Sequence, residues 1–242
     1  MGLKLMCVTA HPDDECYAFG GALALAADRG VETYVVCLTD GQAATNRGDA
    51  ADGEALGSMR REEFRVSCEV LGVTHYELMN YQDAQLEFVD LSRASEELVV
   101  RMRRFKPDVV ITFGGDGGQN THPDHMIASM VTTAAFHWSG QPKRYPGAGD
   151  PHKVQRLYYV TANFVMRDRQ PAMMMPWSVA LDIRSVRERK NEAFRRHVSQ
   201  APLMEKTKEI FERYGAEEFY ALAAATEPQV CRLQTDLFEG LS

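Results

Sequence analysis

Short apolar runs alternate with helical patterns through the first half of the chain, and this alternation limits the possible folds more than any other feature. The runs expected to form strands are Leu3–Thr9, Glu32–Leu38, His75–Met79 and Asp108–Phe113. The helical patterns between them lie near Gly20–Arg29, Ser58–Leu71 and Leu91–Phe105. Alternation of this kind is typical of parallel βαβ units. We therefore expect an α/β fold: a three-layer, Rossmann-like, doubly wound and mostly parallel sheet with helices on both faces, in one domain over residues 1–242.

The second half of the chain is less regular. Strands are expected at Gln155–Thr161 and Trp177–Asp182, and helices at Ser185–His197 and Pro202–Tyr214. The Gly- and Pro-rich stretch Ser139–Lys153 predicts a long surface loop. Gly41–Gly57 has no periodicity and follows the second strand, so it is expected at the carboxyl edge of the sheet. Both a substrate-covering lid and a plain flexible loop fit that stretch.

The charge balance and the cysteines narrow the class of protein. Asp and Glu number 34 against 27 Lys and Arg, which gives a formal net charge of −7. An acidic chain without a concentrated basic tract is a poor candidate for binding nucleic acid through its phosphates. No apolar stretch is long enough to span a bilayer, and no signal peptide is expected. Five cysteines without a Cys-x-x-Cys pair favour buried, reduced thiols, so we expect a cytoplasmic protein without a membrane partner.

Two motifs rich in His and Asp follow predicted strands. Ala-His-Pro-Asp-Asp-Glu occupies 10–15, directly after the first strand, and His-Pro-Asp-His occupies 122–125, after the fourth strand and a glycine-rich turn. Each is expected to place its first His at a helix N-cap and its Pro at the first helical position. In a doubly wound sheet of order 3-2-1-4-5, strands one and four are neighbours, and their carboxyl ends form the crevice where ligands bind. We therefore expect the two motifs to meet in space.

The side chains of these motifs suit a metal site. Residues three apart on a helical turn face the same way, so His11 converges with Asp14, and His122 with His125. Imidazole and carboxylate ligands without sulfur, three in number and with one position open, are typical of catalytic zinc. We assign His11, Asp14 and His125 as the ligands of one Zn²⁺ per chain, while Fe²⁺ or Ni²⁺ also occupies similar N/O sites.

The remaining polar groups of the motifs have predicted roles beside the metal. Asp13 is placed to act as a general base toward water. His122 is placed either to stabilise a developing oxyanion or to protonate a leaving amine. Glu15 and Asp124 are expected to orient imidazoles from behind the ligands. Either motif alone would more often be a structural helix cap, but two motifs at adjacent strand ends favour a site.

The paired motifs resemble those of the PIG-L/LmbE-type zinc-dependent deacetylases. The resemblance extends through Arg-Arg-Glu-Glu at 60–63, Leu-Gly-Val at 71–73, Asp83 and Ser-Gln at 199–200. Members of this family remove acetyl groups from N-acetylglucosamine conjugates, including precursors of mycothiol, of bacillithiol and of glycosylphosphatidylinositol anchors. The resemblance implies the same roles for the motif residues, and it implies that Arg60 and Asp83 hold the substrate beyond the sugar. Asn120 stands where mycothiol-pathway members tend to carry a tyrosine.

These observations predict a metal-dependent hydrolase that removes an N-acetyl group from a small N-acetylglucosamine-type sugar conjugate. One alternative is an amidase that cleaves a larger acyl group from a thiol conjugate or an antibiotic, with a pocket shaped differently by loops 41–57 and 139–153. Another alternative is a catalytically silent sugar-binding protein on the same scaffold. The absence of Gly-x-Gly-x-x-Gly after the first strand disfavours a dinucleotide cofactor. The family resemblance is compatible with a homo-oligomer.

Overall fold

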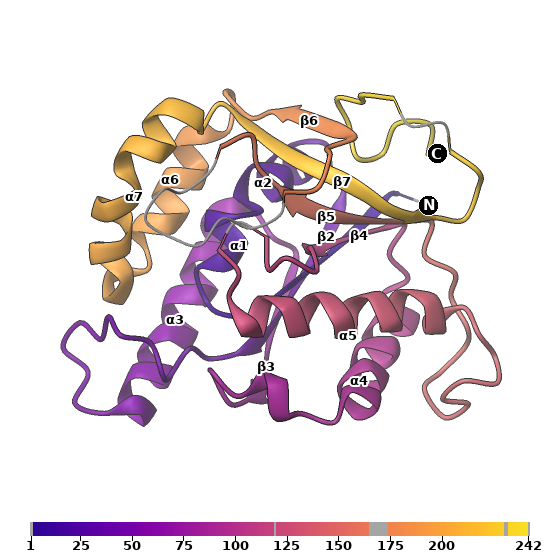
Figure 1. Ribbon diagram of the computed structural model, residues 1–242, viewed down its shortest axis with the longest axis horizontal. Coiled ribbons are helices and arrows are strands. Elements are labelled where there is room, and N and C mark those ends of the chain that lie inside the picture. Colours follow the sequence, from indigo (N-terminus) through magenta and orange to yellow (C-terminus); the bar gives the residue numbers. More distant parts are fainter. Residues whose placement is uncertain (1, 119, 165–173, 230–231, 242) are drawn as a thin grey trace.

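A seven-stranded sheet forms the centre of the computed structural model, which describes residues 2–118, 120–164, 174–229 and 232–241 (Figure 1). The strands are β1 (Lys4–Thr9), β2 (Glu32–Thr39), β3 (His75–Tyr81), β4 (Val109–Phe113), β5 (Arg156–Thr161), β6 (Val179–Asp182) and β7 (Glu217–Ala225). Their spatial order is β3-β2-β1-β4-β5-β7-β6. The strands from β3 to β5 in this order are parallel, while β7 is antiparallel to both β5 and β6. The predicted mostly parallel sheet and its order 3-2-1-4-5 are confirmed.

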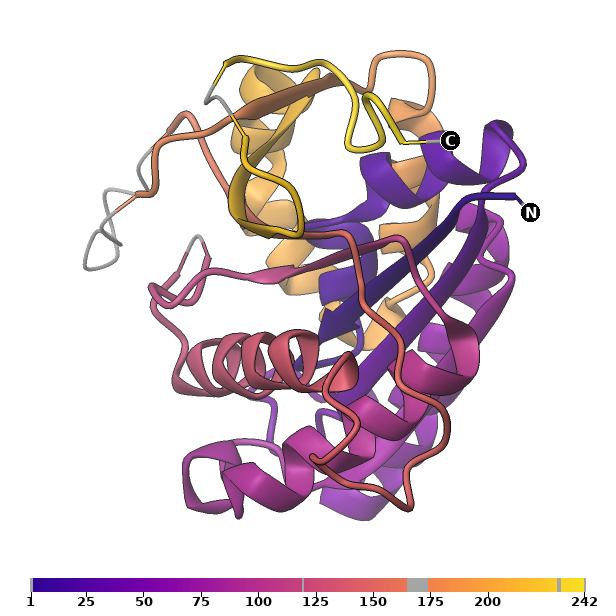
Figure 2. The same ribbon diagram turned by 90° about the vertical axis from the view of Figure 1, so that its right-hand side faces the viewer.

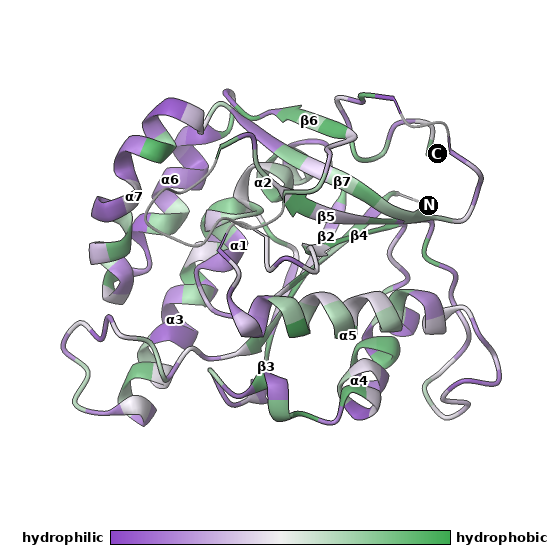
Figure 3. Cartoon of the chain, viewed as in Figure 1, coloured by the Kyte–Doolittle hydropathy of each residue, from purple (hydrophilic) through white to green (hydrophobic). Residues whose placement is uncertain are grey.

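The central strands are buried on both sides. Cys7 of β1 pairs with Val35 of β2 and with Ile111 of β4, and all five residues of β4 are buried. Strands covered by helices on both faces become continuous apolar runs, as the hydropathy colouring shows for the middle of the sheet (Figure 3). The four cysteines in the described ranges are buried and unpaired, as predicted; Cys231 lies outside those ranges.

Helices cover both faces of the sheet. They are α1 (Asp14–Tyr17), α2 (Gly20–Asp28), α3 (Gly53–Leu71), α4 (Leu91–Phe105), α5 (Pro123–Ser139), α6 (Arg187–Arg195) and α7 (Ala201–Tyr214), with short 3₁₀ helices η1 (Leu86–Phe88) and η2 (Val198–Gln200). The pair α4 and α5 packs on one face, and α2, α3 and α6 pack together on the other (Figure 2). In the part of the chain that the structure describes, no helix combines the length and the apolar character needed to cross a membrane.

Helix α3 begins earlier than the sequence pattern predicts. Asp52 is its N-cap, and the Asp52 carboxylate accepts the backbone N–H of Ala55 at 2.9 Å. The irregular segment after β2 is therefore 40–52 rather than 41–57. The predicted stop is confirmed, because Gly72 adopts a left-handed conformation (φ 79°) at the C-cap, where glycine has no steric penalty.

Strand β7 lies where the sequence pattern predicts no element. Its residues, Glu-Glu-Phe-Tyr-Ala-Leu-Ala-Ala-Ala, include several strong helix formers, but pairing between β5 and β6 makes them a strand. Glu218 of β7 accepts the N–H groups of Gly21 (2.6 Å) and Ala22 (2.9 Å) in the first turn of α2. Lys190 donates to the same carboxylate at 2.6 Å. The N-cap residue of α2, Phe19, makes no side-chain hydrogen bond to the helix. Glu218, paired with Lys190, accepts the N–H groups of the first turn instead.

The segment 140–155 connects α5 to β5 and is held by one buried arginine. The guanidinium of Arg103 donates to the carbonyls of Ser139 (3.0 Å), Gln141 (2.9 Å), Arg144 (2.8 Å) and Tyr145 (2.7 Å). Because this segment leads into the start of β5, it lies at the amino edge of the parallel strands. The predicted surface loop is present, but it lies at the edge opposite the carboxyl ends of β1 and β4.

Candidate metal centre and active site

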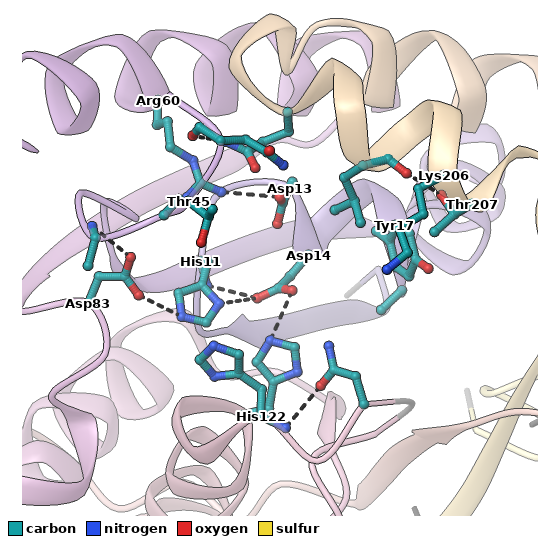
Figure 4. A pocket seen from close by; sticks show the side chains of 18 of the residues that line it. His11, Asp13, Asp14, Tyr17, Thr45, Arg60, Asp83, His122, Lys206 and Thr207 are labelled. Carbon is teal, nitrogen blue, oxygen red and sulfur yellow. Dashed lines mark hydrogen bonds and ion pairs between the residues drawn. The ribbon is translucent and has the colours of Figure 1, made fainter. Parts of the chain in front are cut away.

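The two motifs meet at the carboxyl ends of the neighbouring strands β1 and β4 (Figure 4). His11 and Asp14 follow β1, and His125 lies in the first turn of α5, which follows β4. One ligand atom from each of these three buried residues lies within 4.8 Å of the others, an arrangement that could hold a metal ion. The prediction that the motifs converge is therefore confirmed.

The local backbone differs between the two motifs. His122 is the N-cap of α5 with Pro123 at the start of the helix, as predicted, and its Nδ1 accepts the backbone N–H of Asp124 at 3.2 Å. The same prediction for the first motif is wrong, because α1 begins at Asp14 and its N-cap is Asp13. Asp13 has φ 108° and ψ −28°, a conformation that costs a non-glycine residue about 1–3 kcal/mol. This turn brings Asp13 and Asp14 to the same cavity.

Hydrogen bonds to the outer ring nitrogens orient both histidines of the group. His125 Nδ1 donates to the carbonyl of Gly117 at 3.0 Å, and its Nε2 lies 3.3 Å from Asp14 Oδ1. His11 Nε2 lies 3.0 Å from Asp83 Oδ1 and 3.2 Å from Asp124 Oδ2, while its Nδ1 lies 3.6 Å from Asp14. One nitrogen of each ring thus faces Asp14, and the other is held by a partner behind it. Metal-ligating histidines are usually held in this way.

Two other groups of metal-ligand type exist within the described ranges. In His11, His122 and Asp124, the Asp124 carboxylate already contacts His11. In Glu15, Cys16 and His197, the Glu15 carboxylate accepts a hydrogen bond from His197 at 2.7 Å, and both side chains are fully buried. The group of two imidazoles and one carboxylate at His11, Asp14 and His125 has the donor set of a catalytic zinc site.

Electrostatics separate the two aspartates of the first motif. Burial acts to raise the pKa of Asp14, but the adjacent His125 and His11 outweigh it and hold that pKa well below its usual range. For Asp13, burial dominates over the neighbouring Arg60 and raises the pKa from 3.8 to about 6. The Asp14 carboxylate is therefore suited to remain ionised between two imidazoles, and the Asp13 carboxyl group is suited to exchange a proton near neutral pH.

The pKa of His122 is lowered to about 4, mainly by burial and then by the neighbouring His11 and His125. Because Nδ1 of His122 accepts the Asp124 N–H, its proton in the neutral ring is on Nε2. At neutral pH this side chain is an uncharged hydrogen-bond donor at the cavity wall.

Arg60 and Asp83 also line the cavity, and both make close protein contacts. Arg60 donates to the carbonyl of Pro12 and to Asp13 Oδ2, the latter at 3.1 Å, and to the carbonyl of Gly41 at 3.0 Å. Asp83 accepts the Ala43 N–H at 2.9 Å in addition to its contact with His11. Gly41 has φ 69°, and a side chain there would displace the Arg60 guanidinium from its present position.

Of the two residues predicted to orient imidazoles, Asp124 contacts His11, a member of the metal-ligand group. Glu15 instead contacts His197, which lies outside that group, and accepts the backbone N–H of Asp13 at 2.9 Å.

The cavity above these residues has a volume of about 390 Å³, within the range of small-molecule sites. Residues 43–46 of the segment after β2 form one wall, and α7 forms another through Leu203, Lys206, Thr207 and Ile210. None of the lining residues comes from 140–155, so the prediction that loop 139–153 shapes the pocket is wrong. The α7 wall had no signal in the sequence, because its helical pattern carries no motif.

Comparison with known proteins assigns the family. The family model PIG-L, described as GlcNAc-PI de-N-acetylase, matches residues 6–136, which include both motifs. The chain belongs to the PIG-L family. Its match therefore spans β1 through most of α5, the part of the fold that carries the candidate metal ligands.

Relatives of this PIG-L family chain include enzymes named for two kinds of amide hydrolysis. It is 31% identical to the diacetylchitobiose deacetylase of Thermococcus kodakarensis over 87% of this chain and 74% of that protein. It is also 31% identical to the mycothiol S-conjugate amidase of Streptomyces coelicolor, over 65% of this chain but only 60% of the amidase. The solved structure of N,N'-diacetylchitobiose deacetylase from Pyrococcus horikoshii shares the fold, with a TM-score of 0.74, 24% identity, and coverage of 90% and 83% of the two chains.

Proposed function

We propose that the protein is a metal-dependent hydrolase that removes the N-acetyl group of an N-acetylglucosamine-type sugar conjugate and releases acetate and a free amine. The observation that carries this proposal is the group of His11, Asp14 and His125 at the floor of a cavity whose wall includes Asp13. Membership of the PIG-L family and the deacetylase among its relatives support the same reaction.

We propose that His11, Asp14 and His125 hold one Zn²⁺ per chain, because neutral imidazole nitrogens and carboxylate oxygens are common ligands of that ion. Fe²⁺ and Ni²⁺ also bind sites with these ligands. A divalent cation bound there supplies Lewis-acid polarisation of the amide carbonyl and lowers the pKa of water.

Asp13 acts as the general base in this proposal. Its raised pKa of about 6 suits a group that first accepts a proton from the attacking water. As the C–N bond breaks, the same carboxyl group returns that proton to the nitrogen, so the sugar leaves as a free amine. Arg60 holds the Asp13 side chain through its hydrogen bond at 3.1 Å.

His122 acts as an oxyanion stabiliser rather than as the proton donor. A ring that is neutral at pH 7 and carries its proton on Nε2 can donate a hydrogen bond to the acetyl oxygen as negative charge develops there. We also propose that Arg60 and Asp83, which both line the cavity, contact the part of the substrate beyond the sugar.

The test is acetate release from a panel of N-acetylglucosamine conjugates: the free sugar, N,N'-diacetylchitobiose, the malate and inositol glycosides, and a thiol-amide conjugate. Each is assayed with zinc-loaded and with chelator-stripped protein. We expect metal-dependent acetate release from at least one N-acetyl sugar. Release of only a larger acyl group from the thiol conjugate would instead show an amidase, and binding without turnover would show a silent sugar-binding protein.

A further inference from the structure

A buried chain of hydrogen bonds runs from Asp13 away from the cavity to His197. The N–H of Asp13 donates to Oε2 of Glu15 at 2.9 Å, and Nε2 of His197 donates to Oε1 of Glu15 at 2.7 Å. The side chains of Glu15 and His197 are both 0% exposed, and the two residues are 182 positions apart. Neither residue lines the cavity, and the hydrogen bond from the Asp13 N–H to Glu15 connects them to the proposed general base.

We propose that His197 is a positioning residue which, through Glu15, fixes the backbone of Asp13 and thereby the direction of its carboxylate. The inference rests on the proposed function only in that it takes Asp13 to be the general base. It assigns a role in the reaction to the segment between α6 and α7, which follows the ligand-bearing motifs by more than 70 residues.

The backbone of Asp13 needs such support because of its conformation. At φ 108° it lies where aspartate is uncommon, and relaxation toward negative φ would change the direction of its side chain, which now contacts Arg60. The Glu15 carboxylate is the hydrogen-bond acceptor of the Asp13 N–H in the structure. A shift of about 1 Å in a catalytic group is enough to lower a rate about 100-fold.

Glu15 in turn needs a partner that fixes it. Its Oε1 accepts from the Ser67 hydroxyl at 2.5 Å and from His197, and only His197 can bring a positive charge. His197 itself is poorly satisfied: its buried Nδ1 has no hydrogen-bond partner within the described ranges, and Glu63 Oε2 lies 4.0 Å away. A buried imidazole with an orphan nitrogen is a poor choice for packing alone. The hydrogen bond to Glu15 explains why an imidazole is found there.

The decisive comparison uses three variants in one short segment. His197→Ala removes the contact with Glu15, and His197→Gln restores an amide N–H near the position of Nε2. Ser199→Ala is the matched control, because Ser199 is also buried but its hydroxyl donates to Glu63, at 2.7 Å, rather than to Glu15. For each variant we measure zinc stoichiometry, melting temperature, and kcat and KM for acetate release. We also determine a crystal structure of the His197→Ala protein.

We expect His197→Ala to bind zinc stoichiometrically and to keep its KM, while kcat falls about 10- to 100-fold. His197→Gln should recover most of that loss, and Ser199→Ala should lower the melting temperature while keeping kcat. In the crystal, the φ of Asp13 should leave the positive region or its contact with Glu15 should lengthen. If His197→Ala is insoluble because it leaves a buried charge, Glu15→Gln/His197→Ala makes the same comparison without that charge.

Wild-type kcat in folded His197→Ala, or an equal loss of kcat in Ser199→Ala, would overturn the proposal. Loss of zinc from His197→Ala would also overturn it, because the residue would then support the metal site. If the wild-type protein hydrolyses no N-acetyl sugar, the proposed function fails, while the conformation of Asp13 in the His197→Ala crystal still decides this inference.

Discussion

Replacing Asp13 by Asn should stabilise the metal-free protein while abolishing most of its activity. Asn has nearly the shape of protonated aspartic acid, its Oδ1 can still accept from Arg60, and it tolerates positive φ well. The substitution therefore removes the carboxylate charge and the base but leaves the backbone turn in place.

The size of the stability gain follows from the pKa of Asp13. Burial raises that pKa from 3.8 to about 6, so the ionised carboxylate at pH 7 costs the folded protein about 3 kcal/mol relative to the neutral form. This cost is nearly full above pH 6 and diminishes as the pH falls from 6 toward 3.8. It is absent at lower pH, where Asp13 is protonated in both the folded and the unfolded states. The gain in stability of Asp13→Asn over the wild type should therefore change with pH in the same way.

Urea unfolding of chelator-treated wild type and Asp13→Asn at pH 4, 5, 6, 7 and 8 measures this difference. Asp13→Ala serves as the control, since alanine lacks both the acceptor for Arg60 and the tolerance for positive φ, and it should be less stable than Asn. Zinc-loaded Asp13→Asn should retain its metal and lose about 10²- to 10⁴-fold in kcat. An Asn variant that is less stable at pH 7, or a stability difference that does not change with pH, would refute the reasoning. Full activity would refute the role of Asp13 as base.

Three further outcomes are expected. Stripping the metal should stop acetate release and lower the melting temperature, and added zinc should restore both; activity that survives stoichiometric metal loss would exclude the metal site. Arg103→Met should lower the free energy of unfolding in urea by roughly 3 kcal/mol or more, because several buried carbonyls lose their hydrogen-bond donor. The kcat of the folded variant should stay the same, since 140–155 does not line the cavity, and a selective loss of kcat would contradict this. Lys190→Met leaves the buried Glu218 carboxylate without a counter-ion and should cost about 3–5 kcal/mol. Lys190→Met/Glu218→Gln should recover part of that loss, whereas additive losses in the double variant would show that the two residues are not coupled.

The fold and the candidate metal-ligand group could be predicted because both follow from short-range patterns and topology. Alternating strands and helices fix a parallel sheet, and in that sheet the ends of β1 and β4 are neighbours. Motifs that follow these two strands, the second after a glycine-rich turn, are then expected to meet, so the convergence of His11, Asp14 and His125 could be predicted. The end of α3 at Gly72 was predictable for the same local reason.

The features that escaped prediction depend on contacts between distant residues. Strand β7 has a helix-forming composition and becomes a strand only because β5 and β6 offer it hydrogen-bonding edges. The left-handed turn at Asp13 is held by Arg60 and Glu15, and nothing in the sequence His-Pro-Asp-Asp shows that Asp13 rather than His11 is the helix N-cap. Similarly, α7 lines the cavity, and the segment before it is bound to Glu63 and Glu15, which are distant in the sequence.

The sequence by itself therefore determined which motif residues gather at the site, because the alternation of strands and helices predicts a doubly wound sheet and the motifs follow strands that are neighbours in such a sheet. The tertiary structure alone decided how each group behaves. Asp13 and Asp14 are adjacent and chemically identical, yet burial raises the pKa of one to about 6 while two imidazoles hold the other well below its usual range. Burial and the distances between charges are properties of the packed molecule, and a linear pattern of residues does not contain them.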